Sequence, residues 1–232
     1  MSHAEQRGFF AAVAEVNRHL VGGARVLEIG SYDVNGSVRA LFSTAGEYIG
    51  VDLEHGPGVD VVSFGHHVDH PDGSYDITIS GECFEHDPHW TETFQNMVRM
   101  TRPGGLVTFS CASVGRPEHG TARTDRTDSP GTQSVGLDYY CNLAAADFER
   151  LPLRSMFSRW RFWYLPTHFD LYFMGAKLGE TRVQFPGDDA IRSLRRLMPL
   201  GDRLARIPMR LLANTVSPQR YQSMILPMWS HS

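Results

Sequence analysis

Apolar residues follow two different periods along the chain, and each period predicts a different element. A stripe at helical spacing opens the sequence and comprises Phe9, Phe10, Val13, Val16 and Leu20. Because glycine commonly follows the last turn of a helix, Gly22-Gly23 predicts its end. A second helix is predicted over 91–100, where Phe94, Met97 and Val98 share one face.

Short apolar runs bounded by turn residues predict strands. They lie at 26–29, 48–52, 59–62, 75–80, 106–111, 157–164 and 170–177. The last two are separated by Leu165-Pro166-Thr167-His168-Phe169 and predict an antiparallel hairpin. Strands that alternate with helices in the first half indicate an α/β fold.

Three further segments lack strand character. Residues 112–136 are rich in Gly, Pro, Ser, Thr and Arg without periodicity, and such a long insertion predicts a substrate lid. Asn142 then predicts the N-cap of a helix that runs to about Leu151. Beyond Gly179, leucines at helical spacing alternate with arginines, so we expect helices broken at Pro199-Leu200-Gly201 and at Pro208.

Composition narrows the class of protein. The 232 residues carry a net charge of −4 and no basic tract, which argues against a nucleic-acid partner. Cys83, Cys111 and Cys141 are an odd, widely spaced set, which predicts reduced thiols. The sequence shows neither an apolar run long enough to span a membrane nor a signal-peptide pattern, so we expect a soluble, cytoplasmic protein.

The residues after the first two predicted strands indicate a ribose-containing ligand. Gly30 lets a ligand approach the backbone closely, and the Asp52 carboxylate can accept both hydrogen bonds of a ribose diol. A dinucleotide fingerprint needs glycines at positions 30, 32 and 35, but Tyr32 and Asn35 occupy two of these. NAD is therefore disfavoured.

Three ordered blocks carry a family resemblance. They are Asp72-Gly73-Ser74-Tyr75-Asp76, Glu82-Cys83-Phe84-Glu85-His86 and Arg102-Pro103-Gly104-Gly105. Together they closely resemble the type 11 branch of the class I S-adenosylmethionine-dependent methyltransferases, over about residues 25–177. The resemblance implies a Rossmann-like, seven-stranded, mostly parallel sheet with an antiparallel closing hairpin. It also implies a methyltransferase domain at 1–179, followed by a C-terminal helical extension at 180–232.

The same resemblance implies the cofactor contacts. Glu28 would bind the methionine amino group, Asp52 the ribose, and the N-terminal helix would cover the cofactor. The full implied set is Glu28, Gly30, Ser31, Gly36, Asp52, Leu53, Phe64, Gly65, Ser80, Gly81 and Glu82. The chain departs from the family where the usual glycine loop is reduced to Gly30 and Gly36, and where Phe64-Gly65 replaces the acidic residue after the third strand.

Methylation of a hydroxyl requires a group that removes its proton, and histidine suits this role near neutrality. His119 in the lid is the predicted base, with a surface loop residue as its alternative. His86 is the second catalytic candidate, with an orienting role as its alternative. Glu85, Tyr139 and Tyr140 are candidate substrate contacts, and a Mg²⁺ ion without assigned ligands is kept as a hypothesis.

The polar lid favours an O-methyltransferase that acts on a sugar, an oligosaccharide or another small polar acceptor. The alternatives are N- or O-methylation of an aromatic natural product, and a catalytically idle module that binds a partner through its C-terminal helices. Because those helices need a surface on which to bury one face, we also predict a homodimer to which the tail contributes.

Overall fold

A single sheet organises the computed structural model, which describes residues 3–229. Within these residues seven strands pair in the order β3-β2-β1-β4-β5-β7-β6. The strands are β1 (Arg25–Ile29), β2 (Glu47–Asp52), β3 (Val61–Val62), β4 (Tyr75–Gly81), β5 (Thr101–Ala112), β6 (Phe157–Leu165) and β7 (Asp170–Lys177).

Strands β1 to β5 pair in parallel, whereas β7 runs antiparallel to both β5 and β6. This arrangement confirms the predicted mostly parallel sheet with its closing hairpin. Central strand β1 lies between β2 and β4, with Glu28 opposite both Gly50 and Ile79. The carboxyl ends of these three strands therefore meet at one edge of the sheet, which is where open α/β sheets bind their ligands.

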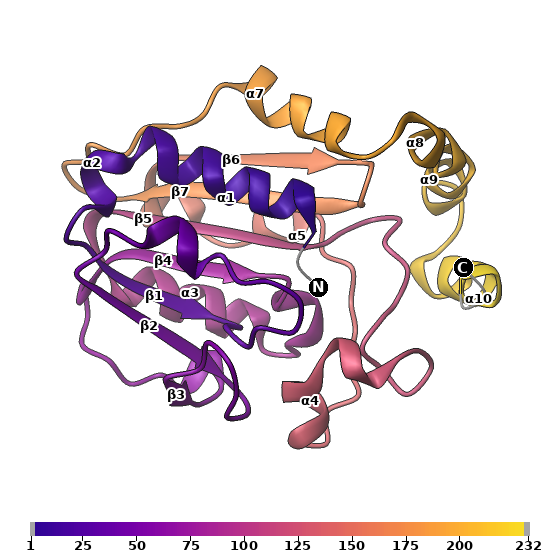
Figure 1. Cartoon of the computed structure of the whole chain (residues 1–232), viewed down its shortest axis with the longest axis horizontal. Coiled ribbons are helices and arrows are strands. Elements are labelled where there is room, and N and C mark those ends of the chain that lie inside the picture. The colour runs from indigo at the N-terminus through magenta and orange to yellow at the C-terminus, as the bar shows by residue number, and fades with distance from the viewer. Residues whose placement is uncertain (1–2, 230–232) are drawn as a thin grey trace.

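Helices flank the sheet, and the C-terminal helices lie together beside it, at the right of the view (Figure 1). The α-helices are α1 (Ala4–Val16), α2 (Arg18–Val21), α3 (Trp90–Met100), α4 (Pro130–Ser134), α5 (Ala145–Phe148), α6 (Leu153–Met156), α7 (Asp188–Ser193), α8 (Leu200–Ala205), α9 (Ile207–Ala213) and α10 (Pro218–Trp229). The 3₁₀ turns are η1 (Arg39–Phe42), η2 (Gly65–His67), η3 (Phe84–His86), η4 (Arg126–Asp128) and η5 (Leu194–Leu197).

Alternating side chains divide the apolar core between the two faces of the sheet. On one face Val26 joins a cluster with Phe9 and Phe10 of α1, and on the other Leu27 joins a cluster with Phe94 of α3. The inner strands β1, β4, β5 and β7 contribute to both clusters and are buried on both sides. This is why these strands appear in the sequence as nearly continuous apolar runs.

Two predicted helices differ from the structure. The opening helix is interrupted at buried Asn17, whose side-chain amide donates to the carbonyls of Val13 and Gln184. The helix predicted from Asn142 to about Leu151 is wrong. The structure has only the single turn α5, and the Asn142 amide donates to the carbonyl of Arg116. Because proline disfavours a helical conformation in the residue before it, Pro152 also prevents a helix from extending through Leu151.

The connection between β1 and β2 also departs from a regular crossover, because it contains only the 3₁₀ turn η1. Its residues 30–37 include Gly30, Asp33, Asn35, Gly36 and Ser37, all of which favour turns over helix. Asp33 accepts a hydrogen bond from the backbone amide of Gly36 at 2.6 Å, which fixes one such turn. The loop is therefore not helical where it borders the ligand-binding edge of the sheet.

The C-terminal segment packs on the rest of the chain at two places. Ile191 of α7 is fully buried in the α1 cluster, and Leu194 lies against Gly8. In α10 the hydroxyl of Tyr221 donates to the carbonyl of Gly115 at 2.7 Å, and the amide of Gln222 donates to that of Arg116 at 2.8 Å. The predicted breaks hold in part, since Pro199 precedes α8 and Pro208 lies in the first turn of α9. Among the described residues, the helices are all too short or too polar to cross a membrane.

Candidate functional site

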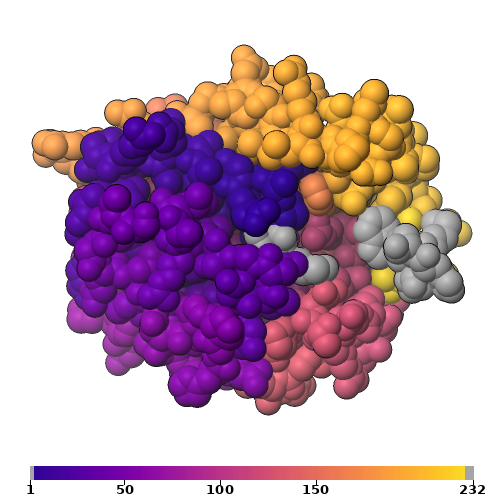
Figure 2. Space-filling view, viewed as in Figure 1, coloured from indigo at the N-terminus to yellow at the C-terminus, as the bar shows by residue number. Residues whose placement is uncertain are grey.

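A cleft opens at the carboxyl ends of β1, β2 and β4. Its walls include most of the predicted cofactor residues, namely Glu28, Gly30, Ser31, Gly36, Asp52, Leu53, Phe64, Gly65, Gly81 and Glu82. Gln6 of α1 borders the cleft from one side, and residues 128–132 of the lid border it from the other. The space-filling view shows the lid beside the loop that follows β1 (Figure 2). Ser80 is fully buried, and its side chain is not part of the cleft lining that the described residues form.

Asp52 is held at the end of β2 by backbone donors. Its Oδ2 accepts from the amide of Tyr32 at 2.9 Å, and its Oδ1 accepts from its neighbour Leu53 at 2.7 Å. Burial raises the pKa of Asp52, whereas these two hydrogen bonds lower it. The lid approaches so closely that a Cβ on Gly131 would lie 2.4 Å from Asp52 Oδ1. A glycine at position 131 therefore lets the lid cover the carboxylate.

Glu28 lines the cleft and is 5% exposed. The hydroxyl of Tyr48 donates to Glu28 Oε2 at 2.7 Å. Burial raises the pKa of Glu28 to about 7, because the charged form loses water, although the Tyr48 hydrogen bond opposes this shift. Glu28 therefore changes charge near neutral pH.

Two residues that line the cleft, Gly30 and Glu82, have a positive φ angle. Gly30 has φ +81, and a side chain there would collide with Cys83, since a Cβ would lie 2.6 Å from the Cys83 Cβ. Glu82 has φ +53, which costs free energy in a residue with a side chain. Its Oε1 accepts from the Ser110 hydroxyl at 2.8 Å, and Arg116 lies 4.0 Å from its Oε2. Strain of this kind is characteristic of functional sites.

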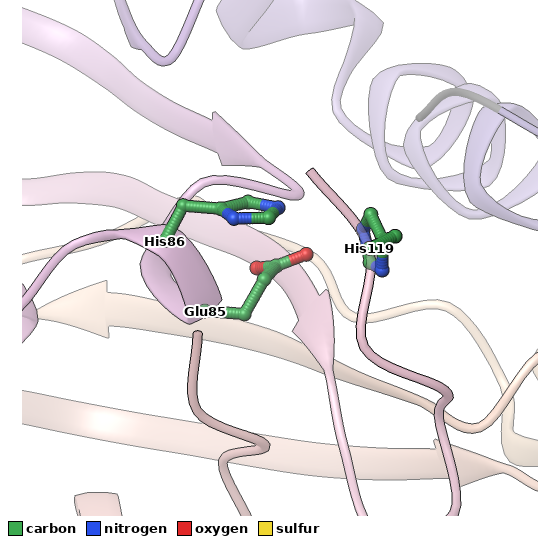
Figure 3. A group of neighbouring side chains, drawn as sticks. All are labelled: Glu85, His86 and His119. Carbon is green, nitrogen blue, oxygen red and sulfur yellow. The ribbon is translucent and has the colours of Figure 1, made fainter. Parts of the chain in front are cut away.

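Beside the cleft, Glu85 and His86 of η3 meet His119 of the lid (Figure 3). All three are buried, with exposures of 0%, 6% and 7% respectively. The rings of His86 and His119 lie edge to face with 5.0 Å between their centroids, and Tyr140 contacts both rings. Burial lowers the pKa of His86 to about 3 and holds that of His119 well below its usual value. Both imidazoles are therefore neutral at physiological pH.

A second cavity, lined in part by His119, lies between the lid, the β6–β7 turn and the C-terminal helices. Most of the residues that line it have polar side chains, among them Arg116, His119, Arg123, Asp125, His168 and Arg206. His86 lines the first cleft and His119 lines this second cavity, so the histidine pair forms part of the partition between them.

The remaining predicted residues lie near this partition. Glu85, Tyr139 and Tyr140 are absent from the linings that the described residues give both cavities. Tyr140 instead packs on the histidine pair, and its hydroxyl donates to the carbonyl of Pro117 at 3.2 Å.

Sequence reasoning missed Arg116, whose guanidinium group joins the lid to the sheet. It pairs with Asp170 at 3.3 Å and donates to the carbonyl of His168 at 2.9 Å. It also missed the contact of Gln6 and of lid residues 128–132 with the first cleft. Nothing in the local sequence marks these residues, because their role depends on contacts between distant segments.

Comparison with known proteins assigns the family. A profile described as a methyltransferase domain matches residues 1–178. The chain therefore belongs to this methyltransferase family, and its sheet has the strand order of the class I S-adenosylmethionine-dependent fold.

Individual relatives are more distant. An uncharacterized methyltransferase of Mycobacterium sp. (strain JLS) is 35% identical over 100 residues, and the match covers 38% of this chain and 39% of that protein. A second uncharacterized methyltransferase, from Mycobacterium sp. (strain KMS), is 34% identical over 100 residues, and the match covers the same shares of the two chains. The chain therefore spans about two fifths of the length of these curated relatives.

Two solved structures share the fold. The 1,6-didemethyltoxoflavin-N1-methyltransferase of Burkholderia thailandensis, solved with S-adenosylhomocysteine, is 19% identical with a TM-score of 0.50, and the match covers 74% of this chain and 78% of that chain. A methyltransferase of Methanosarcina mazei is 14% identical with a TM-score of 0.50, over 72% of this chain and 98% of that one. At such identities these likenesses concern the fold alone.

Proposed function

We propose that the protein transfers the methyl group of S-adenosylmethionine to a hydroxyl of a sugar, an oligosaccharide or another small polar acceptor. The first cleft supplies the groups that the cofactor needs. Asp52 offers carboxylate oxygens for a ribose diol, and Glu28 offers a carboxylate for the methionine ammonium group. Family membership and the class I strand order support the same cofactor.

The set of polar side chains around the second cavity is the observation that carries the choice of acceptor. Arginines, acids and histidines surround it, and the apolar side chains in its lining are Pro117, Leu226 and Pro227. Charged and hydrogen-bonding groups recognise a hydroxylated acceptor, whereas a flat aromatic ring needs apolar walls. The lining therefore favours a polar acceptor over an aromatic natural product.

The histidine pair lies where the two ligands would meet. Methyl transfer is an in-line displacement, so the acceptor oxygen must lie behind the methyl group, opposite the sulfonium. An acceptor in the second cavity would reach the cleft beside His119 and His86.

The histidine base stays a prediction. Nε2 of His119 has no hydrogen-bond partner within the described residues, as a base requires. Burial makes this imidazole weakly basic, so a further group that acidifies the hydroxyl would help the reaction.

Mass spectrometry tests the proposed function. The protein is incubated with isotopically methyl-labelled cofactor and with separate pools of monosaccharides, oligosaccharides and aromatic metabolites. A gain of one labelled methyl group on a carbohydrate hydroxyl is the expected result. Labelling confined to aromatic compounds would overturn the polar-acceptor proposal. A protein that binds cofactor but labels none of the pools would favour the idle interaction module.

Replacing Asp52 by alanine should weaken cofactor binding by about 1–3 kcal/mol, which is the range for losing charge-assisted hydrogen bonds. Isothermal calorimetry with S-adenosylmethionine measures this loss. Asp69→Ala is a suitable control, because Asp69 is exposed and does not line the cleft. Unchanged affinity in Asp52→Ala, or a wild-type preference for NAD, would contradict the ribose assignment.

Cofactor affinity should also depend on pH through Glu28. Because the pKa of Glu28 is raised to about 7, the carboxylate is protonated below this pH and loses its attraction for the ammonium group. We expect the dissociation constant to fall as the pH rises from about 6 to about 8, by at most roughly tenfold per unit below the pKa. Glu28→Gln should flatten this dependence. An equally steep profile in Glu28→Gln would assign it to another group.

We further propose that the chain divides into a methyltransferase domain at 1–179 and an extension at 180–232, and that the extension contributes to a homodimer. Leu200 and Leu211 of the extension are 60% and 63% exposed, and Leu197, Leu204 and Ile207 are exposed beside them in sequence. Burial of such side chains against a second copy would stabilise the pair.

Leu200→Glu together with Leu211→Glu should convert the dimer to a monomer in light-scattering measurements. These substitutions are preferable to truncation after Gly179, because truncation would also remove buried Ile191 and Tyr221. Leu178→Glu, at an exposed site outside the extension, is the matched control. A monomeric wild type, or a dimer that survives the double substitution, would overturn the proposal.

A further inference from the structure

Four polar atoms in the Glu85, His86 and His119 cluster lack hydrogen-bond partners among the described residues. They are both carboxylate oxygens of Glu85, Nδ1 of His86 and Nε2 of His119. A buried polar group without a partner costs free energy, and a buried carboxylate costs most unless a cation or a proton compensates it. One such atom would be an ordinary exception, but four in one cluster call for a shared partner.

The side chains that carry these atoms converge. One ligand atom from each residue lies within 4.8 Å of the others, as a common bound ion would require. Figure 3 shows the Glu85 carboxylate between the two imidazole rings, with His119 approaching from a separate segment. The cluster joins η3 to the lid, two segments that are far apart in sequence.

The hydrogen bond of His119 uses Nδ1 and leaves Nε2 available as a ligand atom. Its Nδ1 lies 3.2 Å from the carbonyl of Pro117, so the proton resides on Nδ1 and Nε2 keeps a lone pair without a partner among the described residues. Metal-binding histidines commonly donate their other ring N–H to a carbonyl oxygen in this way, which fixes both the tautomer and the ring orientation.

We infer that Glu85, His86 and His119 bind one divalent transition-metal ion, for which Zn²⁺ is the best match. Two imidazole nitrogens and one carboxylate form the ligand set of several catalytic zinc sites, in which a fourth position stays open for water or substrate. Imidazole also suits Fe²⁺ and Co²⁺, whereas Mg²⁺ prefers oxygen ligands. The magnesium hypothesis from the sequence is therefore less suited to this donor set.

A second group of candidate ligands makes an instructive contrast. His3, Glu82 and Asp170 also lie within 4.8 Å of one another. There the charge is already balanced, because the guanidinium of Arg116 lies 3.3 Å from Asp170 and 4.0 Å from Glu82. The Nε2 of His3 also contacts Asp170 at 2.5 Å. The second group is thus an ion-pair network, and the inference concerns the first group alone.

The role of the ion rests on the proposed function, which puts the acceptor hydroxyl beside His119. An oxygen in the open position would lie between the two cavities, and the positive charge would lower the pKa of that hydroxyl. The hydroxyl proton would pass to solvent water, and a lone pair of the oxygen would form the new bond to the methyl carbon. The S–C bond of the sulfonium would break, which would release S-adenosylhomocysteine. In this arrangement His119 acts as a ligand rather than as the base.

Metal analysis tests the inference without an activity assay. The untagged protein of 232 residues is stripped with a chelator and titrated with Co²⁺ or Zn²⁺. Its metal content is measured by mass spectrometry, and bound cobalt is followed by its visible spectrum. We expect about one ion per chain, with affinity reduced by more than roughly 100-fold in Glu85→Gln and in His119→Ala, since even changes behind the ligands cost 10- to 100-fold. Mg²⁺ should not compete at equal concentration.

His67→Ala is the control for surface binding, because His66, His67 and His89 form a more exposed group of rings. Its metal content should equal that of the wild type. A wild type that binds no Co²⁺ or Zn²⁺, or cluster variants that keep full metal content, would overturn the site. Calorimetry with S-adenosylmethionine on the same samples shows whether each variant is folded. Intact cofactor binding without metal binding would refute the metal site and leave the proposed methyltransferase function standing.

Discussion

Replacing His119 by alanine is expected to lower the turnover number roughly 10²- to 10⁴-fold, the range for losing a group that acts on the proton of a reacting hydroxyl. Cofactor affinity should stay close to that of the wild type, because the His119 side chain lines the second cavity rather than the first cleft. Steady-state kinetics with the acceptor found by mass spectrometry, combined with calorimetry for the cofactor, separates these two quantities.

His86→Ala distinguishes the two roles that His119 can have. If His119 is the base, His86→Ala should lose less turnover than His119→Ala. The turnover of neither variant should then depend on its metal content. If the histidines share a metal ion, both variants should lose turnover and bound metal together. His67→Ala, at an exposed site, should behave as the wild type in either case. Normal turnover in His119→Ala with loss in His86→Ala would reverse the roles that the sequence suggested.

The sheet could be predicted from the sequence because each strand has a local run of apolar residues. Apolar runs ending in Gly30, Asp52 and Gly81 predicted strands whose carboxyl ends meet, and the structure brings these residues to one cleft. Parallel strands buried on both faces need such runs, so this part of the fold depends little on long-range context. The motif blocks then identified the family to which the chain belongs.

The meeting of Glu85 with His119 could not be read from the sequence. It depends on the path of a lid that is anchored at Arg116, whose side chain donates to the carbonyl of His168 and whose own carbonyl accepts from Asn142 and Gln222. The sequence predicted a lid at 112–136 and proposed His119 as its reactive residue. The partner residues of His119, and the burial that makes it a weak base, come only from packing between these segments.

Local signals were also misleading where a side chain had a better partner elsewhere. Asn142 resembles a helix N-cap, but its amide donates to the backbone of the lid instead. Asn17 interrupts the first helix because its amide bridges to the carbonyl of Gln184, beyond β7. In both cases a tertiary hydrogen bond outweighs a local preference, which is worth only about 1 kcal/mol at a helix cap.

Arg116→Met should destabilise the whole fold by about 3–5 kcal/mol, the usual cost of removing one partner from a buried ion pair. The side chain of Arg116 is 12% exposed and that of Asp170 is fully buried. Burial alone would lower the pKa of Arg116, but the facing carboxylates of Asp170 and Glu82 raise it, so the guanidinium stays charged. Methionine fills a similar volume and leaves both carboxylates buried without their cation.

Urea unfolding measures this loss, and Arg102→Met supplies the matched control. Arg102 pairs with Asp76 at 2.6 Å, but both side chains are substantially exposed, so the same substitution should cost only about 0–1 kcal/mol. Asp170→Asn combined with Arg116→Met should cost less than the sum of the two single changes, because the groups interact directly. Equal losses in Arg116→Met and Arg102→Met would show that the buried network contributes no more than a surface pair. The anchoring of the lid would then have to be assigned to Asn142 and Gln222.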